Sequence, residues 1–138
     1  MREIEFRGKT PEGKWIYGGI SITNDRAWID QGFIGREWFG DTFVDKDTIG
    51  QYTGIKDEND IEIYEGDIIK FSYDAFIGNF DTFTAKGIVV FEDGAFFVNC
   101  LENERNIKDE QFLLYEINID AIEIIGNIWD NPELLKEN

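Results

Sequence analysis

The sequence predicts a mainly β protein, with an N-terminal β meander and a small C-terminal barrel. Three observations lead to this fold class. The 138 residues include 14 glycines but only two prolines, the glycines mostly separate short apolar stretches, and Asp-Gly stands between two of those stretches. Strands joined by tight turns have this pattern. Aromatic residues make up 15% of the chain, so a chain of this length can bury a core as one domain or as two small subdomains.

The N-terminal part is expected to form the meander. Two strands are predicted at 4–8 and 14–20. Thr10-Pro11-Glu12-Gly13 joins them as a turn, because proline favours the second position of a turn and glycine the fourth. A third strand is predicted at 27–34, and residues 42–44 are expected to pair with it.

The middle of the chain alternates between strands and connections. Residues 47–54 contain two glycines without a clear period and are expected to form a structured connection. Strands are predicted at 61–64 and 67–72, on either side of the tight Glu65-Gly66 pair. Residues 74–84 contain three phenylalanines among glycine and polar residues, and a long, partly packed loop is expected there.

The strongest hairpin signal in the chain is Asp93-Gly94, which stands between strands predicted at 87–91 and 95–100. Residues 102–110 are expected to form a charged loop or a helical turn. Residues 112–117 fit either a helix or a strand, because their apolar positions follow both periods.

The chain closes with a strand and a short helix. The strand is predicted at 121–129, where Gly126 marks a bulge or a bend. Asn131 is a suitable N-cap and Pro132 suits the first helical position, so a short helix is expected to begin here. Five short strands with tight turns in this part of the chain are typical of a small barrel.

A boundary between two subdomains is predicted in the middle of the chain. Residues 1–54 would form the N-terminal β subdomain and residues 55–138 the C-terminal barrel subdomain, and a single domain is the alternative. The core is predicted from the alternation of apolar residues in the strands. It comprises Phe6, Trp15, Tyr17, Ile63, Ile68, Val90, Phe97, Ile125, Ile128 and Trp129.

The composition excludes several classes of site. The chain has no histidine and one cysteine, Cys100, which removes Ser-His-Asp and Cys-His catalysis, histidine-metal sites and an intramolecular disulfide. The net charge is −16, so direct binding to nucleic acid is not expected. No apolar run approaches the ~20 residues of a membrane helix, and the N-terminus lacks the apolar region of a signal peptide. We therefore expect a cytoplasmic protein that contacts neither nucleic acid nor membranes.

Two acidic groups invite a metal-binding or catalytic interpretation. Asp57-Glu58-Asn59-Asp60 begins like a calcium loop, but Glu62 and Ile68 stand where such a loop requires glycine and a bidentate glutamate. A solvated turn is therefore predicted. Glu65 and Asp67 could form an acid pair, but we expect Asp67 to accept hydrogen bonds from N–H groups of the turn. No catalytic, cofactor-binding or metal-binding residue is predicted.

Several blocks of the sequence occur in the same order as in a known family. The most specific are Thr48-Ile49-Gly50-Gln51-Tyr52-Thr53-Gly54, followed by Asp57, and Glu62-Ile63-Tyr64-Glu65-Gly66-Asp67-Ile68-Ile69. The others lie at 1–9, 15–18, 87–94 and 123–135. Together they resemble the YopX family. The resemblance implies a small protein of a bacteriophage or prophage with a mostly β fold and an SH3-like barrel in the C-terminal part. It implies no activity and no catalytic residue.

A phage accessory protein that binds another protein without catalysis is the predicted function. The lack of a catalytic constellation, a fold type often used for binding and the abundance of aromatic residues favour it. The candidate surface for a partner or a second subunit is formed by Trp28, Phe33, Trp38 and Phe39, whose neighbourhood mixes basic and acidic side chains. A homo-oligomer is expected, and no cofactor.

Two alternatives from other functional classes stay open. A compact acidic phage protein can place carboxylates where the phosphates of DNA lie, and so inhibit a host nucleic-acid enzyme as a DNA mimic. A metal-dependent hydrolase that uses aspartate and glutamate alone requires carboxylates that converge on one pocket. Displacement from its target by DNA would identify the mimic, and converging carboxylates would favour the hydrolase.

Overall fold

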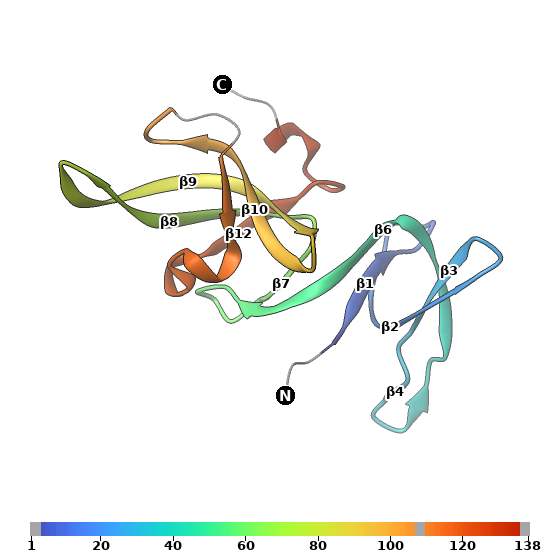
Figure 1. Ribbon diagram of the computed structural model, residues 1–138. Helices are drawn as coiled ribbons and strands as arrows, with labels where there is room; N and C mark the ends of the chain where they lie inside the picture. The colour runs from blue at the N-terminus through green and yellow to red at the C-terminus, as the bar shows by residue number, and fades with distance from the viewer. Residues whose placement is uncertain (1–3, 107–109, 136–138) are drawn as a thin grey trace. The chain divides into compact units, whose positions relative to one another are not determined.

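Antiparallel strands form nearly all of the regular structure, which confirms the predicted mainly β fold (Figure 1). The structure is a computed structural model that describes residues 4–106 and 110–135, without the side chains of Phe33, Ile34 and Ile77. The chain divides into two compact units, Met1–Gly54 and Ile55–Asn138.

The strands of the N-terminal unit pair in a closed circuit. They are β1 (Phe6–Lys9), β2 (Trp15–Thr23), β3 (Arg26–Asp30), β4 (Phe33–Ile34), β5 (Glu37–Trp38) and β6 (Asp41–Lys56), whose last residues belong to the second unit. β1 pairs with β2, β2 with β3 and β3 with β6, and β6 also pairs with β1. β4 and β5 form a small hairpin between β3 and β6. The predicted meander therefore returns to its first strand.

The expected connection at 47–54 is wrong, because these residues continue the 16-residue strand β6. The register of β6 against β1 shifts between Arg7 and Lys9. At this irregularity the hydroxyl of Thr48 accepts a hydrogen bond from the Lys9 N–H at 2.8 Å and donates one to the Asp45 carbonyl at 2.6 Å. A side chain thus replaces a ladder hydrogen bond, which allows the strand to continue through a bulge.

The C-terminal unit contains one antiparallel sheet in the order β11-β10-β9-β8-β12. The strands of this unit are β7 (Glu62–Tyr64), β8 (Asp67–Ile77), β9 (Asn79–Glu92), β10 (Ala95–Asn103), β11 (Gln111–Leu113) and β12 (Glu123–Asn127). Its 3-10 turns are η1 (Leu114–Glu116), η2 (Ile119–Ala121) and η3 (Pro132–Leu135). β7 pairs with β6, whose last residues belong to the same unit. β11 and β12 stand at the ends of the five-stranded order, so the closed SH3-like barrel stays a prediction.

The expected loop at 74–84 is also wrong. β8 and β9 run through this segment and pair up to Ile77 and Asn79, with the turn at Gly78, whose φ is +74°. The segment lacks the apolar alternation of a half-buried strand because its end is exposed. Backbone pairing between the two strands holds it instead.

The two short-range strand signals near the C-terminus are confirmed. Asp93 and Gly94 have φ values of 50° and 81°, and the tight I′ turn of a hairpin requires both to be positive. The register between β12 and β8 shifts between Ile124 and Gly126, which is the predicted bulge.

The ambiguous segment 112–117 combines both interpretations, because β11 ends at Leu113 and η1 follows it. The predicted short C-terminal helix is the 3-10 turn η3. The expected N-cap role of Asn131 is wrong, since its side chain accepts a hydrogen bond from the Asn127 N–H at 3.1 Å. That contact closes the turn before η3 and leaves the oxygen pointing backwards along the chain.

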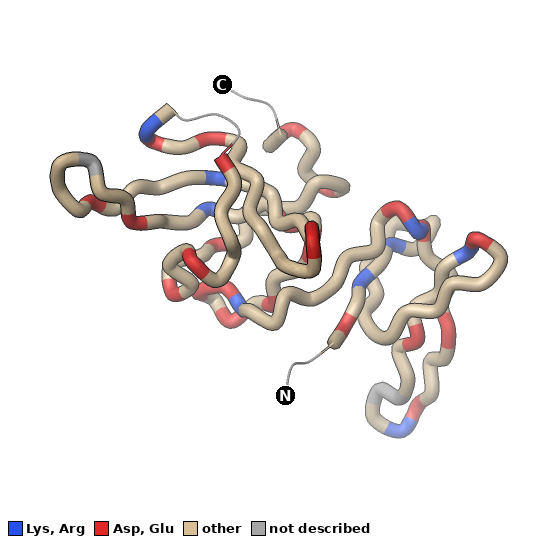
Figure 2. The backbone as a smooth tube through the Cα atoms, viewed as in Figure 1, with Lys and Arg blue, Asp and Glu red and all other residues tan. Residues whose placement is uncertain are grey.

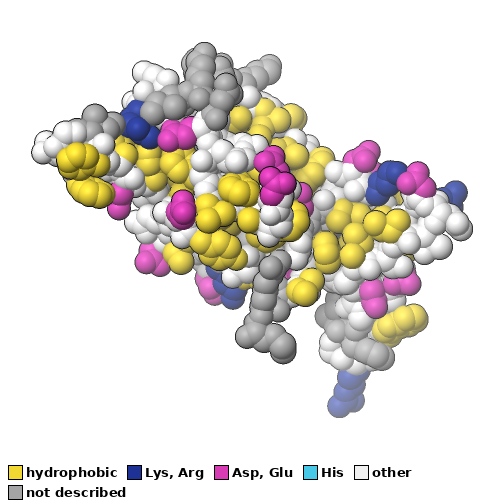
Figure 3. Space-filling view, in the orientation of Figure 1, with side chains coloured by type: hydrophobic (Ala, Val, Ile, Leu, Met, Phe, Trp, Pro, Cys, Tyr) yellow, Lys and Arg dark blue, Asp and Glu magenta, His cyan; other side chains and the backbone are white. Residues whose placement is uncertain are grey.

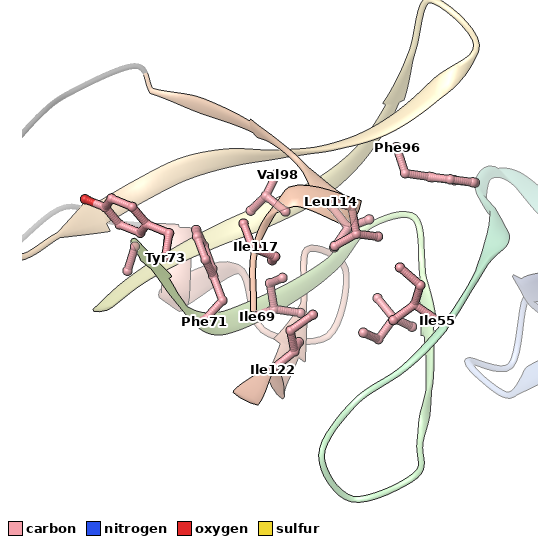
Figure 4. Packing of buried hydrophobic residues seen from close by; sticks show 12 residues of the cluster. Ile55, Ile69, Phe71, Tyr73, Phe96, Val98, Leu114, Ile117 and Ile122 are labelled. Atoms are coloured by element: carbon pink, nitrogen blue, oxygen red, sulfur yellow. The ribbon is translucent and has the colours of Figure 1, made fainter. Parts of the chain in front are cut away.

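Each unit has its own hydrophobic core. The N-terminal core consists of Ile16, Ala27, Ile29 and Val44, with Phe6 and Ile49 packed against it. The larger C-terminal core comprises Ile55, Ile63, Ile69, Phe71, Tyr73, Ala85, Val89, Phe96, Val98, Leu114, Ile117 and Ile122 (Figure 4).

The predicted core residues are buried in some strands, whereas in other strands an adjacent residue is buried in place of the predicted one. Ile63 and Ile68 are fully buried. Tyr17 is 44% exposed, and Val90 and Phe97 are only half-buried, whereas Val89, Phe96 and Val98 are buried. These strands carry apolar residues on both faces, so alternation does not reveal which face points inward, and a shift of one residue exchanges the faces.

Asp57 is buried, with 7% of its surface exposed, so the prediction of a solvated turn is wrong for this residue. One carboxylate oxygen accepts hydrogen bonds from the N–H groups of Asn59 and Ile61, both at 2.9 Å. The other accepts a hydrogen bond from the N–H of Ile124 on β12 at 3.2 Å. The first acidic residue of this calcium-like pattern therefore accepts hydrogen bonds from backbone N–H groups.

The turn between β7 and β8 combines a buried carboxylate with a close ring contact. Asp67 accepts a hydrogen bond from the Tyr64 N–H at 2.8 Å, which confirms its predicted role. Gly66 has a φ of +94°, and a Cβ at this position would overlap the ring of Trp129. Only glycine therefore meets both the backbone and the packing requirement.

We predict that Gly66→Ala lowers the free energy of unfolding by about 2–5 kcal/mol, because it adds overpacking against Trp129 to the strain of a positive φ. The matched control is Gly94→Ala, where φ is +81° and a Cβ would meet nothing within 4 Å. We expect this variant to lose about 1–2 kcal/mol from strain alone. Urea denaturation measures both, and equal losses would contradict the ring contact.

Candidate functional site

The aromatic residues predicted to form a partner surface lie on one strand–hairpin–strand segment of the N-terminal unit. Trp28 on β3 is half-buried, Trp38 on β5 is 66% exposed and Phe39 is 45% exposed. The side chain of Phe33 on β4 lies outside the described residues. Phe43 on β6, which is 44% exposed, was missed by the sequence analysis. We call Trp28, Trp38, Phe39 and Phe43 the aromatic segment.

Backbone pairing positions these rings. Trp28 and Phe43 are cross-strand partners of β3 and β6, and their ring centroids lie 6.0 Å apart in an edge-to-face arrangement. The Trp38 ring lies over Gly40, where a Cβ would come within 3.0 Å of the ring. Phe43 could have been predicted from the expected pairing of 42–44 with the third strand, because that pairing places Phe43 beside Trp28.

Acidic groups predominate around the aromatic segment. Residues 25–47 contain six acidic and three basic side chains, and Figure 2 shows both signs in this unit. Lys46 donates a hydrogen bond to the Asp25 carboxylate at 2.6 Å. That hydrogen bond and the negative charge of Asp25 raise the pKa of Lys46. Both residues and Phe43 line an open cleft of about 360 Å³.

A second cleft, of about 310 Å³, lies on β8, β9 and β10 of the C-terminal unit, and its lining includes Lys70. Lys86 lies 3.4 Å from a carboxylate oxygen of Glu102. Glu104 accepts hydrogen bonds from the Thr84 hydroxyl at 2.7 Å and from the Thr84 N–H at 3.1 Å. These two hydrogen bonds lower the pKa of Glu104. Both carboxylates of the cleft are therefore engaged by the protein itself.

Arg105 and Glu110, which follow β10 in the chain, form a partly buried ion pair. Arg105 donates hydrogen bonds to the two carboxylate oxygens of Glu110 at 3.0 and 3.3 Å, and one to the Tyr73 hydroxyl at 2.8 Å. The hydrogen bond to Tyr73 raises the pKa of Arg105. The guanidinium also lies 5.0 and 5.3 Å from the ring centroids of Tyr73 and Phe83, a cation–π geometry. This cluster fastens the chain to the base of the β8–β9 hairpin.

Within residues 4–106 and 110–135, no set of three or more cysteine or acidic side chains is placed to hold a metal ion. Cys100 is half-buried, and its sulfur lies 3.5 Å from the side-chain amide of Asn103. No helix in the described part of the chain is long and apolar enough to cross a membrane.

We predict that Thr84→Val raises the pKa of Glu104 toward its ordinary value, because the variant lacks the hydroxyl that stabilises the carboxylate. A lowered folded-state pKa contributes stability above the unfolded pKa that is lost as pH falls through the folded one. NMR titration of the side-chain carboxyl carbons measures the shift. The control is Thr82→Val, which removes a hydroxyl bound to Asp74 and should leave Glu104 unchanged. An unchanged Glu104 pKa in Thr84→Val would contradict this origin.

Comparisons with known proteins agree with this architecture. The family model for YopX protein matches residues 5–136. The crystal structure of protein EF1440 from Enterococcus faecalis is similar, with a TM-score of 0.55 and 25% sequence identity over 99% of this chain and 100% of that chain. The comparison with curated proteins found no match. Because the family model covers nearly all of its residues, the chain belongs to the YopX family.

Proposed function

We propose that this chain is a protein-binding module without catalytic activity and that the aromatic segment of its N-terminal unit contacts the partner. The exposure of Trp38, at 66%, is the observation that carries this proposal. Phe39 and Phe43 add two further rings within five residues, both more than 40% exposed. Exposed aromatic rings are typical of interfaces, and tryptophan is enriched among the side chains that contribute most to binding.

The acidic groups support a role without catalysis. Asp57, Asp67 and Glu104 accept hydrogen bonds from the chain's own backbone. A carboxylate held in this way serves the fold, which supports a structural role for these three residues. The proposal includes a phage or prophage accessory role in the bacterial cytoplasm, as the resemblance to the YopX family implies.

Self-association is a related part of the proposal, since the same rings can contact a second copy. Two copies, each with a net charge of −16, repel one another at low ionic strength. Salt screens this repulsion over a Debye length of ~8 Å at 0.15 M, so contact between copies should tighten as salt is added.

To test the proposal, the tagged chain is used to isolate its partner from host cells, and the purified partner is titrated with purified variants. We expect W38A/F39A to bind at least about thirtyfold more weakly, since side chains of this kind contribute about 2 kcal/mol or more. The control is Ile22→Thr on β2, which is also exposed, at 63%, in the same unit, and should bind like the wild type.

Both variants should keep the wild-type Tm because they alter exposed side chains. Equal affinity of W38A/F39A and the wild type would contradict the proposal. Displacement of the partner by duplex DNA would instead identify the acidic chain as a DNA mimic.

A further inference from the structure

The free end of the β8–β9 hairpin extends beyond the rest of its sheet (Figure 1). β12 pairs with β8 as far as Lys70, and β10 pairs with β9 as far as Ala85. Within the described residues, backbone hydrogen bonds from other segments reach Ser72 and Thr84. Residues 74–82 therefore form a two-stranded ribbon, a structure that is marginal alone, and its base is held by the buried Tyr73 and by Phe83, which packs against the core.

The ribbon ends in a pair of exposed rings. Phe76 and Phe80 are direct cross-strand partners, so they stand on the same face, with ring centroids 5.6 Å apart. Their side chains are 67% and 78% exposed, and Figure 3 shows hydrophobic atoms at the end of this hairpin. Pairing across the strands orders the rings without burying them, so a partner would bind them with little loss of conformational entropy.

The charge beside these rings is negative and fixed in position. Asp74 and Asp81 are the charged residues between 71 and 85. The Asp74 carboxylate accepts a hydrogen bond from the Thr82 hydroxyl at 2.8 Å, and the Asp81 carboxylate accepts one from the Thr82 N–H at 2.9 Å. Asp74 stands two residues before Phe76 and so shares the face of the ring pair, whereas Asp81 pairs with Ala75 and stands on the opposite face of the ribbon.

Among the described residues, the cations Lys70 and Arg105 do not neutralise this charge. Lys70 precedes Asp74 by four residues, about 13 Å along a strand at ~3.3 Å per residue, which exceeds the ~8 Å Debye length at 0.15 M salt. Arg105 approaches the base of the ribbon but is paired with Glu110. The end of the hairpin is therefore both apolar and negatively charged.

We propose that this end of the hairpin is a docking tip, which inserts Phe76 and Phe80 into an apolar pocket of a protein partner whose rim carries lysine or arginine. The cationic rim is complementary to Asp74 on the face of the rings and to Asp81 on the opposite face of the tip. A second copy of this chain fits the tip poorly, because two tips would bring like charges together. An anionic membrane surface is disfavoured for the same reason. The docking tip lies in the C-terminal unit and is independent of the aromatic segment.

To test the tip, a displayed library of random dodecapeptides is selected on the full-length chain, and each selected peptide is synthesised and titrated. We expect a group of peptides rich in lysine or arginine beside apolar residues. They should bind F76T/F80T at least tenfold more weakly than the wild type and bind W38A/F39A normally. Threonine keeps the β propensity of the strands, so the Tm of F76T/F80T should stay within about 4 °C of the wild type.

A second variant separates charge from ring burial. D74N/D81N keeps both rings and an oxygen acceptor for each hydrogen bond of Thr82, so its fold should not change. It should weaken the same peptides and flatten the dependence of their affinity on salt. Peptides whose binding is weakened only by W38A/F39A test the proposed function and not the docking tip.

The proposal is overturned if no selected peptide depends on Phe76 and Phe80, or if the dependent peptides lack basic residues and bind D74N/D81N normally. Sedimentation of the wild type as a dimer that F76T/F80T converts to a monomer would assign the tip to contact between copies. Binding to phosphatidylcholine vesicles that F76T/F80T abolishes would assign it to a membrane. Either result would overturn the proposal that the tip enters a pocket of a protein partner.

Discussion

The C-terminal unit depends on the hydrogen bonds that the buried carboxylate of Asp57 accepts. It accepts hydrogen bonds from the N–H groups of Asn59 and Ile61 in its own turn, and from Ile124, which lies 67 residues further along the chain. A buried N–H without an acceptor costs about 1–3 kcal/mol. One side chain therefore closes the turn before β7 and also fastens β12, the strand that completes the sheet.

Anchors of this kind explain why so many rings remain at the surface. Side chains such as Asp67 and Thr48 satisfy backbone groups at turns and bulges, and small cores fill the interior of each unit. The fold therefore does not require burial of the aromatic segment or of Phe76 and Phe80. A protein that holds its backbone in this way can present rings to a partner without losing its own stability.

Features that depend on a few neighbouring residues could be predicted from the sequence. The Asp93-Gly94 hairpin, the bulge at Gly126 and the role of Asp67 all follow from local backbone chemistry. The strand at 74–84 could not be predicted, because it is held by pairing and not by apolar alternation. For Val90 the inward face depends on packing across the sheet, which a doubly apolar strand does not encode.

The same distinction applies to the candidate site. Trp38 and Phe39 stand out in the sequence as aromatic residues among side chains of mixed charge, whereas Phe43 is found only through the pairing of β3 with β6. The exposure of Phe76 and Phe80 depends on where β10 and β12 stop, and that is set by contacts distant in sequence.

Exposed rings are expected to bind a partner while the buried rings keep their positions. Fluorine NMR of the chain labelled with 4-fluorophenylalanine, titrated with the purified partner, tests it most directly. Each signal is assigned by a single phenylalanine substitution. We expect shifts for Phe39 and Phe43 and none for Phe71 and Phe96, which are buried. Shifts confined to Phe71 and Phe96 would mean that binding rearranges the core, and would contradict the account.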